Sequence, residues 1–213
     1  MYSHHTSMPL DIHYEDPDIY VINKPAGLLS VPGRGEEKYD SVQSRCQAFA
    51  PAAMAAHRLD MATSGLLLIA KHKAAERHYK QEFAARRVEK RYIAVVHGNI
   101  ADDRGDIEYP LITDWERRPR QKICYEHGKT AHTSYKVLAR NGGATTRVAL
   151  TPHTGRSHQL RVHLAAIGHP ILGDEFYANE NPPAAPRLLL HAETLAVANL
   201  HGILQRFHLN PAF

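Results

Sequence analysis

The sequence predicts an α+β fold in which a few helices pack on a mixed or antiparallel sheet. Apolar runs of strand length outnumber segments with helical periodicity, which favours a sheet as the main element. The two kinds of segment do not alternate regularly, as they would in a parallel βαβ sheet. No repeat, low-complexity tract or long linker divides the 213 residues. We therefore expect one domain over residues 12–213, preceded by a loose polar tail at residues 1–11.

Short apolar runs bounded by turn residues mark the expected strands. They are residues 19–22, 66–70, 92–96, 133–138, 145–150, 187–192 and 194–198. Asn141-Gly142-Gly143 is a typical hairpin turn between two of them. Three further segments have helical signals, namely residues 42–49, 73–87 and 158–167. Ser41 and Ser157 are placed to cap the first and the last of these helices, and Gly168 fits a helix end.

The charge balance is mildly basic, with 26 Lys and Arg against 22 Asp and Glu and a formal net charge of +4. This balance favours a polyanionic partner without proving one. Cys46 and Cys124 do not form a disulfide framework, so we expect two reduced thiols. Residues 1–7 lack a secretory signal, and the longest apolar run, residues 66–70, is too short for a membrane span. We therefore expect a cytoplasmic protein without membrane contact.

Three residues are candidates for chemistry. Asp60 precedes an apolar strand, where an aspartate is either a turn residue or a carboxylate nucleophile kept ionised by a nearby cation. Arg161 lies about 100° from Leu160 at the margin of the apolar stripe of its helix, so it either reaches such a carboxylate or faces solvent. Tyr92 opens a strand, and is either a core residue or a phenol that stacks on a base and accepts a proton.

Two basic clusters suit a nucleic-acid partner, because Lys and Arg neutralise phosphates and aromatic rings stack on unpaired bases. The first cluster is Arg86, Arg87, Lys90 and Arg91, which is also compatible with a solvated charged face. The second contains Arg117, Arg118, Arg120 and Lys122, flanked by Trp115 and Tyr125. Their combination favours folded RNA with a splayed loop.

Metal and nucleotide cofactors are not expected. The chain has 16 histidines, but His153, His158 and His163 are five residues apart, a spacing that turns successive side chains about 140° around a helix. HExxH and Cys/His zinc motifs are absent, as are GxxxxGK[ST] and GxGxxG. We therefore expect neither a metal site nor a bound nucleotide cofactor.

Four ordered motifs resemble those of the RluA-type pseudouridine synthases. They are residues 57–68 (HRLDMATSGLLL), 90–94 (KRYIA), 154–163 (TGRSHQLRVH) continued by 168–174 (GHPILGD), and 187–192 (RLLLHA). The resemblance implies a pseudouridine synthase fold, which is a mixed, mostly antiparallel sheet with flanking helices and a central RNA-binding cleft. Many such enzymes carry an N-terminal S4 RNA-binding domain. We expect none here, because the similarity starts near residue 12.

The same resemblance implies roles for individual residues. Asp60 matches the nucleophilic aspartate, Tyr92 the active-site tyrosine, and Arg161 the arginine that pairs with the aspartate. Arg58 matches an arginine that enters the space left by the flipped base. Three residues of the third motif are expected to contact RNA as well, namely Arg156, His158 and Gln159.

Residues 23–27 (NKPAG) and the loop at residues 114–125 resemble the members of this family that act on both rRNA and tRNA. They imply 23S rRNA and a tRNA anticodon stem-loop as partners. Specificity is expected to come from the loop at residues 116–122, and a monomer is expected. The reaction is an isomerisation and needs no cofactor. Asp60 would either attack C1′ or take a C2′ proton, and the sequence leaves both open.

Two other functions compete with this one. An N-glycosidase acting on RNA would usually need a second carboxylate flanking the bond, and no clear second candidate is present. A non-catalytic RNA-binding module would explain the basic clusters, but it would leave the combination of Asp60, Tyr92 and Arg161 unexplained.

Overall fold

The computed structural model describes residues 9–178 and 184–213, and one large sheet dominates it. The strands of this sheet are β1 (Asp11–Glu15), β2 (Ile19–Lys24), β3 (Met54–Ala55), β4 (Ser64–Ala70), β5 (Glu89–His97), β6 (Arg104–Ile107), β9 (Thr133–Asn141), β10 (Thr145–Pro152), β11 (Leu190–Ala198) and β12 (Leu204–His208). A separate hairpin consists of β7 (Leu111–Thr113) and β8 (Gln121–Ile123). The helices are α1 (Val42–Gln47), α2 (Lys73–Ala84) and α3 (Gln159–Ala166), with short turns η1 (Glu36–Lys38) and η2 (Trp115–Arg117).

The strand order is β1-β2-β4-β11-β5-β10-β9-β6, with β12 paired to β11 and β3 to β4. Among the described strands every pairing is antiparallel except that of β4 with β11, where His191 lies beside Ser64 and Ala192 beside Gly65. Gly65 has φ +110°, and a Cβ there would lie 2.4 Å from the carbonyl oxygen of Ala192. A glycine is therefore required where these two strands meet.

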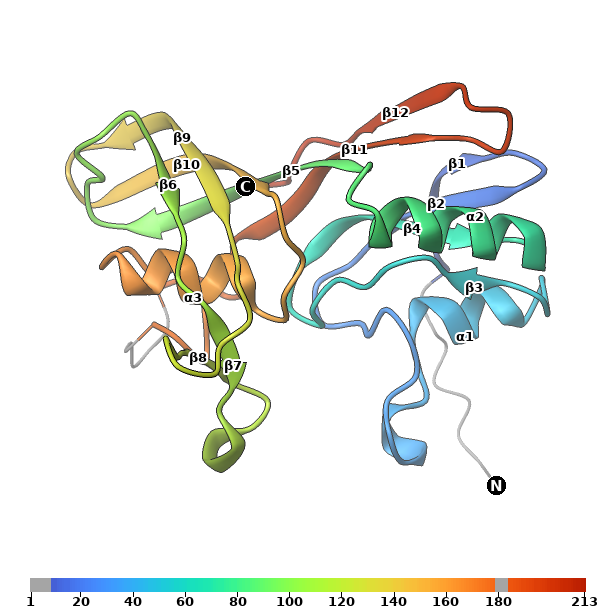
Figure 1. The fold of residues 1–213 in the computed structure, drawn as a ribbon, viewed down its shortest axis with the longest axis horizontal. Coiled ribbons are helices and arrows are strands. Elements are labelled where there is room, and N and C mark those ends of the chain that lie inside the picture. The colour runs from blue at the N-terminus through green and yellow to red at the C-terminus, as the bar shows by residue number, and fades with distance from the viewer. Residues whose placement is uncertain (1–8, 179–183) are drawn as a thin grey trace.

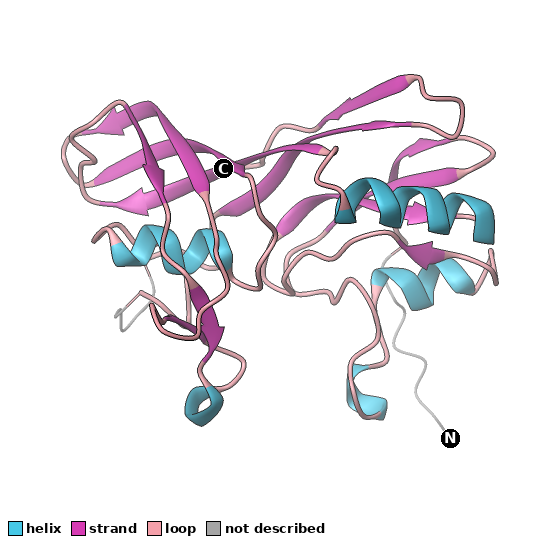
Figure 2. Ribbon diagram, in the orientation of Figure 1, coloured by secondary structure: helices cyan, strands magenta, loops and turns pink. Residues whose placement is uncertain are grey.

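The sheet joins two halves that lie side by side (Figure 1). In one half, α1 and α2 cover opposite faces of β2 and β4, because alternate residues of a strand point to opposite faces. Val21 packs with Tyr79 of α2, and Ile22 with Val42 of α1. In the other half, α3 packs through Leu160 and Leu164 on β5 and β10. The η1 loop and the β7–β8 hairpin extend from the same side of the sheet (Figure 2).

The structure confirms the α+β prediction and most of the expected elements. Ser41 caps α1, its hydroxyl accepting a hydrogen bond from the backbone N–H of Ser44, and Gly168 ends α3 with φ +85°. The expected hairpin joins β9 and β10. Among the described residues, no helix is long and apolar enough to cross a membrane.

Four sequence-based expectations are corrected. Residues 187–192 and 194–198 do not form two strands, because β11 continues through a bulge between Ala192 and Thr194. Ser157 does not cap α3; the N-cap is His158 in a left-handed conformation, and the Gln159 side chain braces the preceding loop instead. The second helix ends at Ala84 rather than at residue 87. Asp11, expected in the tail, begins β1, while residues 1–8 lie outside the described part.

Candidate active site

Asp60 lies in the loop between β3 and β4, and hydrogen bonds hold the backbone on both sides of it. The Ser30 hydroxyl donates to the Leu59 carbonyl (2.8 Å) and accepts from the Leu59 N–H (2.9 Å). The Met61 carbonyl accepts from the Gly27 N–H at 2.8 Å and from Lys24 Nζ at 2.9 Å. The Asp60 side chain is free of these bonds and 27% exposed. A fixed backbone therefore presents an accessible carboxylate.

Lys24 is a buried cation beneath this loop, with no exposed surface. Its ammonium donates to the carbonyls of Pro25, Leu28 and Met61. Burial lowers the pKa of Lys24 to about 7, although the negative charge of the nearby Asp60 acts in the opposite direction and raises it. Three carbonyl acceptors use all three N–H groups of an ammonium, so they favour the charged form. Lys24 thus ties the end of β2 to the Asp60 loop.

Arg161 is almost fully buried on α3, and its main partner is Asp174. Nε donates to Asp174 Oδ2 at 2.8 Å, and Nη2 donates to Oδ1 at 2.7 Å, while both side chains are at most 2% exposed. Such a two-pronged pair fixes the plane of the guanidinium. Burial disfavours the charge, but the hydrogen bonds and charges of Asp174 and Asp60 raise the pKa of Arg161 above its ordinary value. Arg161 is therefore a fixed cation.

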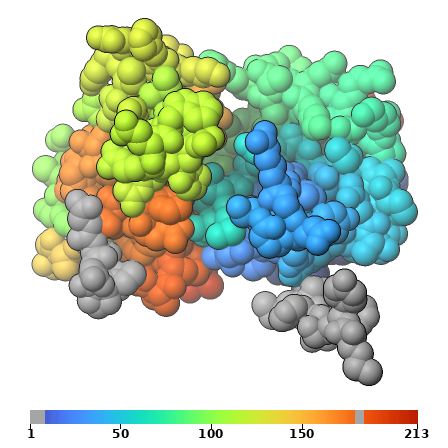
Figure 3. Space-filling view, turned by 90° about the horizontal axis from the view of Figure 1, so that it is seen from below, coloured from blue at the N-terminus to red at the C-terminus, as the bar shows by residue number. Residues whose placement is uncertain are grey.

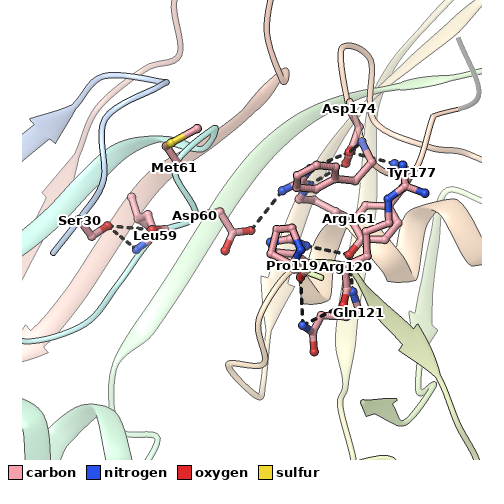
Figure 4. A network of polar contacts seen from close by, with 12 residues as sticks. Ser30, Leu59, Asp60, Met61, Pro119, Arg120, Gln121, Arg161, Asp174 and Tyr177 are labelled. Atoms are coloured by element: carbon pink, nitrogen blue, oxygen red, sulfur yellow. Dashed lines mark hydrogen bonds and ion pairs between the residues drawn. The ribbon is translucent and has the colours of Figure 1, made fainter. Parts of the chain in front are cut away.

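The third nitrogen of this guanidinium faces Asp60. Arg161 Nη1 lies 3.8 Å from Asp60 Oδ2, at ion-pair distance but beyond a hydrogen bond. The two side chains come from opposite halves of the molecule and point toward one another (Figure 4). The expected pairing of Asp60 with Arg161 thus exists, and the solvent-facing alternative for Arg161 is wrong. Because Asp174 occupies the other two nitrogens, only Nη1 is left to face Asp60, whose side chain stays partly exposed.

Aromatic side chains surround the guanidinium. The rings of Phe176 and Tyr177 have their centroids 5.0 and 5.3 Å from Arg161 Cζ. The Tyr177 hydroxyl accepts from the Gln121 N–H at 2.8 Å, so it can donate its own proton to His158 Nδ1 at 2.7 Å. Burial lowers the pKa of His158, which agrees with a neutral ring that accepts this bond. His158 is thus held at the site by a tyrosine rather than free on a surface.

Tyr92 lies on β5 and packs against the cores of both halves. Burial raises the pKa of its phenol, and the Asp60 charge raises it further. The phenol is therefore neutral at physiological pH, and its ring lies within the electrostatic reach of Asp60. Asp60 and Arg161 therefore meet across the two halves, and the phenol of Tyr92 is close enough to feel the Asp60 charge.

Gln159 does not have the surroundings of an RNA contact. Gln159 is 4% exposed, and its amide bonds the Thr154 hydroxyl, the Arg156 N–H and the His132 carbonyl. Its polar atoms are used inside the protein, so the expected RNA contact by Gln159 is corrected to a structural role. Arg156 Nε donates to the Thr130 carbonyl at 3.1 Å and braces the same loop.

Ion pairs and ring contacts anchor the loop between β7 and β8. Asp114 is 2% exposed and holds Arg117 at 2.8 Å, with Lys122 at 3.8 Å. Trp115 is 67% exposed, and the Arg118 guanidinium lies 4.7 Å from its ring. Arg120 lies over Phe176 at 5.7 Å, which connects the loop to the aromatic residues beside Arg161.

The first basic cluster is partly neutralised inside the protein. Arg87 pairs with Glu82, and Arg91 with Glu193. Arg58 is exposed and lies two residues before Asp60 in the chain, next to the buried Leu59. On the face that carries the two loops the surface is hollowed between the halves (Figure 3).

Sequence reasoning did not assign roles to Lys24, Asp174 and Tyr177. Lys24 and Asp174 lie in two segments that resemble family motifs, residues 23–27 and 168–174. Their burial was the missing information, because an isolated Lys or Asp in a sequence is usually exposed. Nothing in the sequence pattern distinguishes Tyr177 from other tyrosines.

One sheet thus joins two halves, and an aspartate of one half faces a buried arginine of the other. Comparison with known families gives the class of protein that carries this arrangement. A family model described as RNA pseudouridylate synthase matches residues 18–166, so the chain belongs to that family. The proteins named dual-specificity RNA pseudouridine synthase RluA include one from Haemophilus ducreyi, which is 55% identical over 94% of this chain and 92% of its own length. Another, from Escherichia coli, is 55% identical over 89% and 87%.

Solved structures show the same fold. Human RNA Pseudouridylate Synthase Domain Containing 1 is 30% identical and superposes with a TM-score of 0.82, over 96% of this chain and 84% of that protein. Human RNA Pseudouridylate Synthase Domain Containing 4 is 24% identical, with a TM-score of 0.77, over 95% and 89%. The predicted pseudouridine synthase fold is thereby confirmed.

Replacing Lys24 with methionine tests its place beneath the Asp60 loop. The folded-state pKa is below the ordinary value of 10.5, so the unfolded chain binds more protons between about pH 7 and 10.5. The contribution of Lys24 to the free energy of unfolding therefore increases as pH rises through this window. We expect the difference between wild type and Lys24→Met, measured by urea denaturation at several pH values, to grow with pH. A pH-independent difference would contradict a lowered pKa.

Proposed function

We propose that this protein converts uridine into pseudouridine in loops of structured RNA, with Asp60 as the group that acts on the ribose. The observation that carries this proposal is the open Asp60 carboxylate, 3.8 Å from the buried guanidinium of Arg161. A carboxylate nucleophile needs a site from which water is restricted. A fixed cation beside it favours its ionised form there. The target nucleotide must leave its stack to reach such a group, at a cost of a few kcal/mol.

The reaction breaks the N1–C1′ bond, turns the detached uracil and joins C5 to C1′. The proton on C5 is lost and N1 gains one, so atoms and electrons balance without a redox partner or cofactor. Asp60 assists departure of the uracil, either by attacking C1′ or by taking a proton from C2′. Arg161 places a positive charge beside the carboxylate, and Asp174 keeps Arg161 in place. Excluding water from the closed site protects the reactive sugar.

We assign the last proton transfer of the reaction to Tyr92. Its phenol is neutral, because burial and the Asp60 charge raise its pKa. It therefore accepts the C5 proton only as its own proton passes to another base, and the Asp60 carboxylate released from the sugar is the nearby candidate. The ring also packs against the base during its rotation.

The substrates we propose are a hairpin-loop uridine of 23S rRNA and a uridine of the tRNA anticodon stem-loop. Support comes from the dual-specificity name of relatives that match most of this chain. Loop uridines are cheaper to extrude than paired ones. Arg58, which is exposed, fills the space left by the flipped base. The loop with Trp115 and Arg118 contacts the surrounding RNA. Residues 12–213 act as one catalytic domain. The protein works as a monomer in the cytoplasm.

The test uses RNA labelled with tritium at C5 of uridine, as an anticodon stem-loop and as an rRNA hairpin. We expect tritium release from both RNAs, with pseudouridine and no free uracil in the digested product. Free uracil would replace the isomerase with an N-glycosidase. The protein could instead bind these RNAs and release no tritium from any of them, including total RNA from a strain that lacks the gene. That result would favour a non-catalytic RNA-binding module.

The loop between β7 and β8 should contribute charge to RNA binding. Arg117→Ala combined with Arg118→Ala removes two cations, so the affinity should fall. The slope of log affinity against log salt should become shallower by up to about 2. Filter binding across a salt series measures both quantities.

A matched control removes the same charge elsewhere, in Arg77→Ala with Lys80→Ala on the exposed side of α2. We expect that variant to bind RNA like the wild type. If the loop variant also kept the wild-type slope, the loop would lie outside the RNA interface.

A further inference from the structure

A second cluster of polar side chains lies on the sheet, away from Asp60, where β6, β9 and β10 run side by side. Asp106 is on β6, His132 directly precedes β9, and His153 directly follows β10. One ligand atom from each of these three side chains lies within 4.8 Å of the others. The cluster belongs to none of the catalytic contacts described above.

The strand register explains why these residues meet. Thr133 pairs with Pro152, so the next cross-strand pair is His132 with His153, and the backbone N–H of His153 donates to the His132 carbonyl at 3.0 Å. Directly opposed residues of antiparallel strands have their Cβ atoms about 5 Å apart. The two imidazole rings accordingly stack with centroids 4.2 Å apart. Asp106 pairs with Ser134, two residues from His132 on the same face.

Hydrogen bonds hold the ligand atoms of Asp106, His132 and His153 close to one another. Asp106 Oδ1 lies 2.8 Å from His132 Nε2 and accepts from the Ser134 hydroxyl at 2.5 Å. The same hydroxyl lies 2.8 Å from His153 Nε2. Glu108 adds another carboxylate, 3.7 Å from His132 Nε2.

We propose that Asp106, His132 and His153 bind a divalent transition-metal ion of the zinc type. Two imidazoles and a carboxylate are a donor set that suits zinc, and water or Glu108 can complete four-coordination. Ligand atoms around a tetrahedral zinc stand about 3.3 Å apart, given bonds of about 2.0 Å. The observed separations need only small side-chain rotations to reach that value.

The site is accessible from solvent. Asp106 is 60% and His132 34% exposed in their side chains. His153 also lines a groove of about 720 Å³ together with Lys90, Arg91 and Arg206. An ion can therefore enter without local unfolding. The helix spacing of His153, His158 and His163 that argued against a metal does not apply to this cluster, because its ligands come from β6 and from the ends of β9 and β10.

The test is a zinc titration of the full chain in competition with a chromophoric chelator. The parent protein carries His4→Gln and His5→Gln, because these adjacent histidines near the start of the sequence could bind zinc themselves. We expect one ion to bind. His132→Gln combined with His153→Gln should weaken binding by at least 10–100-fold, the scale on which even outer-sphere substitutions act. The control His201→Gln removes an exposed histidine elsewhere and should change nothing.

X-ray absorption of the zinc-loaded protein gives a second readout. We expect two imidazole nitrogens at about 2.0 Å and one or two oxygens. Circular dichroism of the zinc-free variants checks that they fold. Equal zinc affinity in the folded double variant and in its parent, or a zinc shell without imidazole, would overturn the proposal.

Discussion

Replacing Asp60 with asparagine is expected to abolish tritium release from 5-tritiated uridine in RNA. Asparagine has the same shape but no negative charge, so it can neither attack C1′ nor take a proton. We expect the rate to fall by about 10⁴-fold or more, the scale seen when a central catalytic group is removed. Single-turnover assays with excess enzyme measure this loss directly, without interference from product release.

The variant should fold, because the hydrogen bonds that hold this loop use the backbone of Leu59 and Met61 rather than the Asp60 side chain. Its RNA affinity should stay close to the wild-type value. Asp103→Asn makes the same chemical change at an exposed ion pair with Arg140 and should leave the rate unaltered. Wild-type tritium release from Asp60→Asn would remove this residue from the mechanism.

Replacing Asp174 with alanine is expected to cause the largest loss of stability. It leaves the guanidinium of Arg161 buried without its two-pronged partner, and only Asp60 remains, at 3.8 Å. Removing one member of a buried ion pair typically costs 3–5 kcal/mol. For a chain of this size each kcal/mol lowers the melting temperature by about 2–4 °C. Thermal and urea denaturation followed by circular dichroism measure both effects.

An exposed ion pair provides the matched control. Glu89 and Arg206 are 61% and 54% exposed, so Glu89→Ala should cost at most about 1 kcal/mol. Asp174→Asn separates charge from geometry, because asparagine keeps the shape but can accept only one of the two bonds from Arg161. We expect it to lie between wild type and Asp174→Ala in stability. If Asp174→Ala were as stable as the Glu89 control, the pair would not fix the guanidinium.

Local sequence signals predicted the elements well, because they depend on neighbouring residues. The apolar run at residues 66–70 became β4, and Ser41 capped α1 through a contact only three residues away. The ordered motifs also placed Asp60, Tyr92 and Arg161 in one site. The bulge in β11 was not predictable in this way, since it arises from pairing with β5 rather than from the strand's own residues.

From the residues alone came the α+β class, the candidate carboxylate and a basic surface suited to RNA. Only the folded chain decided which charges are buried and which atoms meet. Asp174 rather than Asp60 holds Arg161 most closely, and Gln159 braces a loop. Asp106, His132 and His153 converge from β6 and from the ends of β9 and β10. Burial and long-range register depend on how distant segments pack, and single side chains in a linear sequence do not reveal that packing.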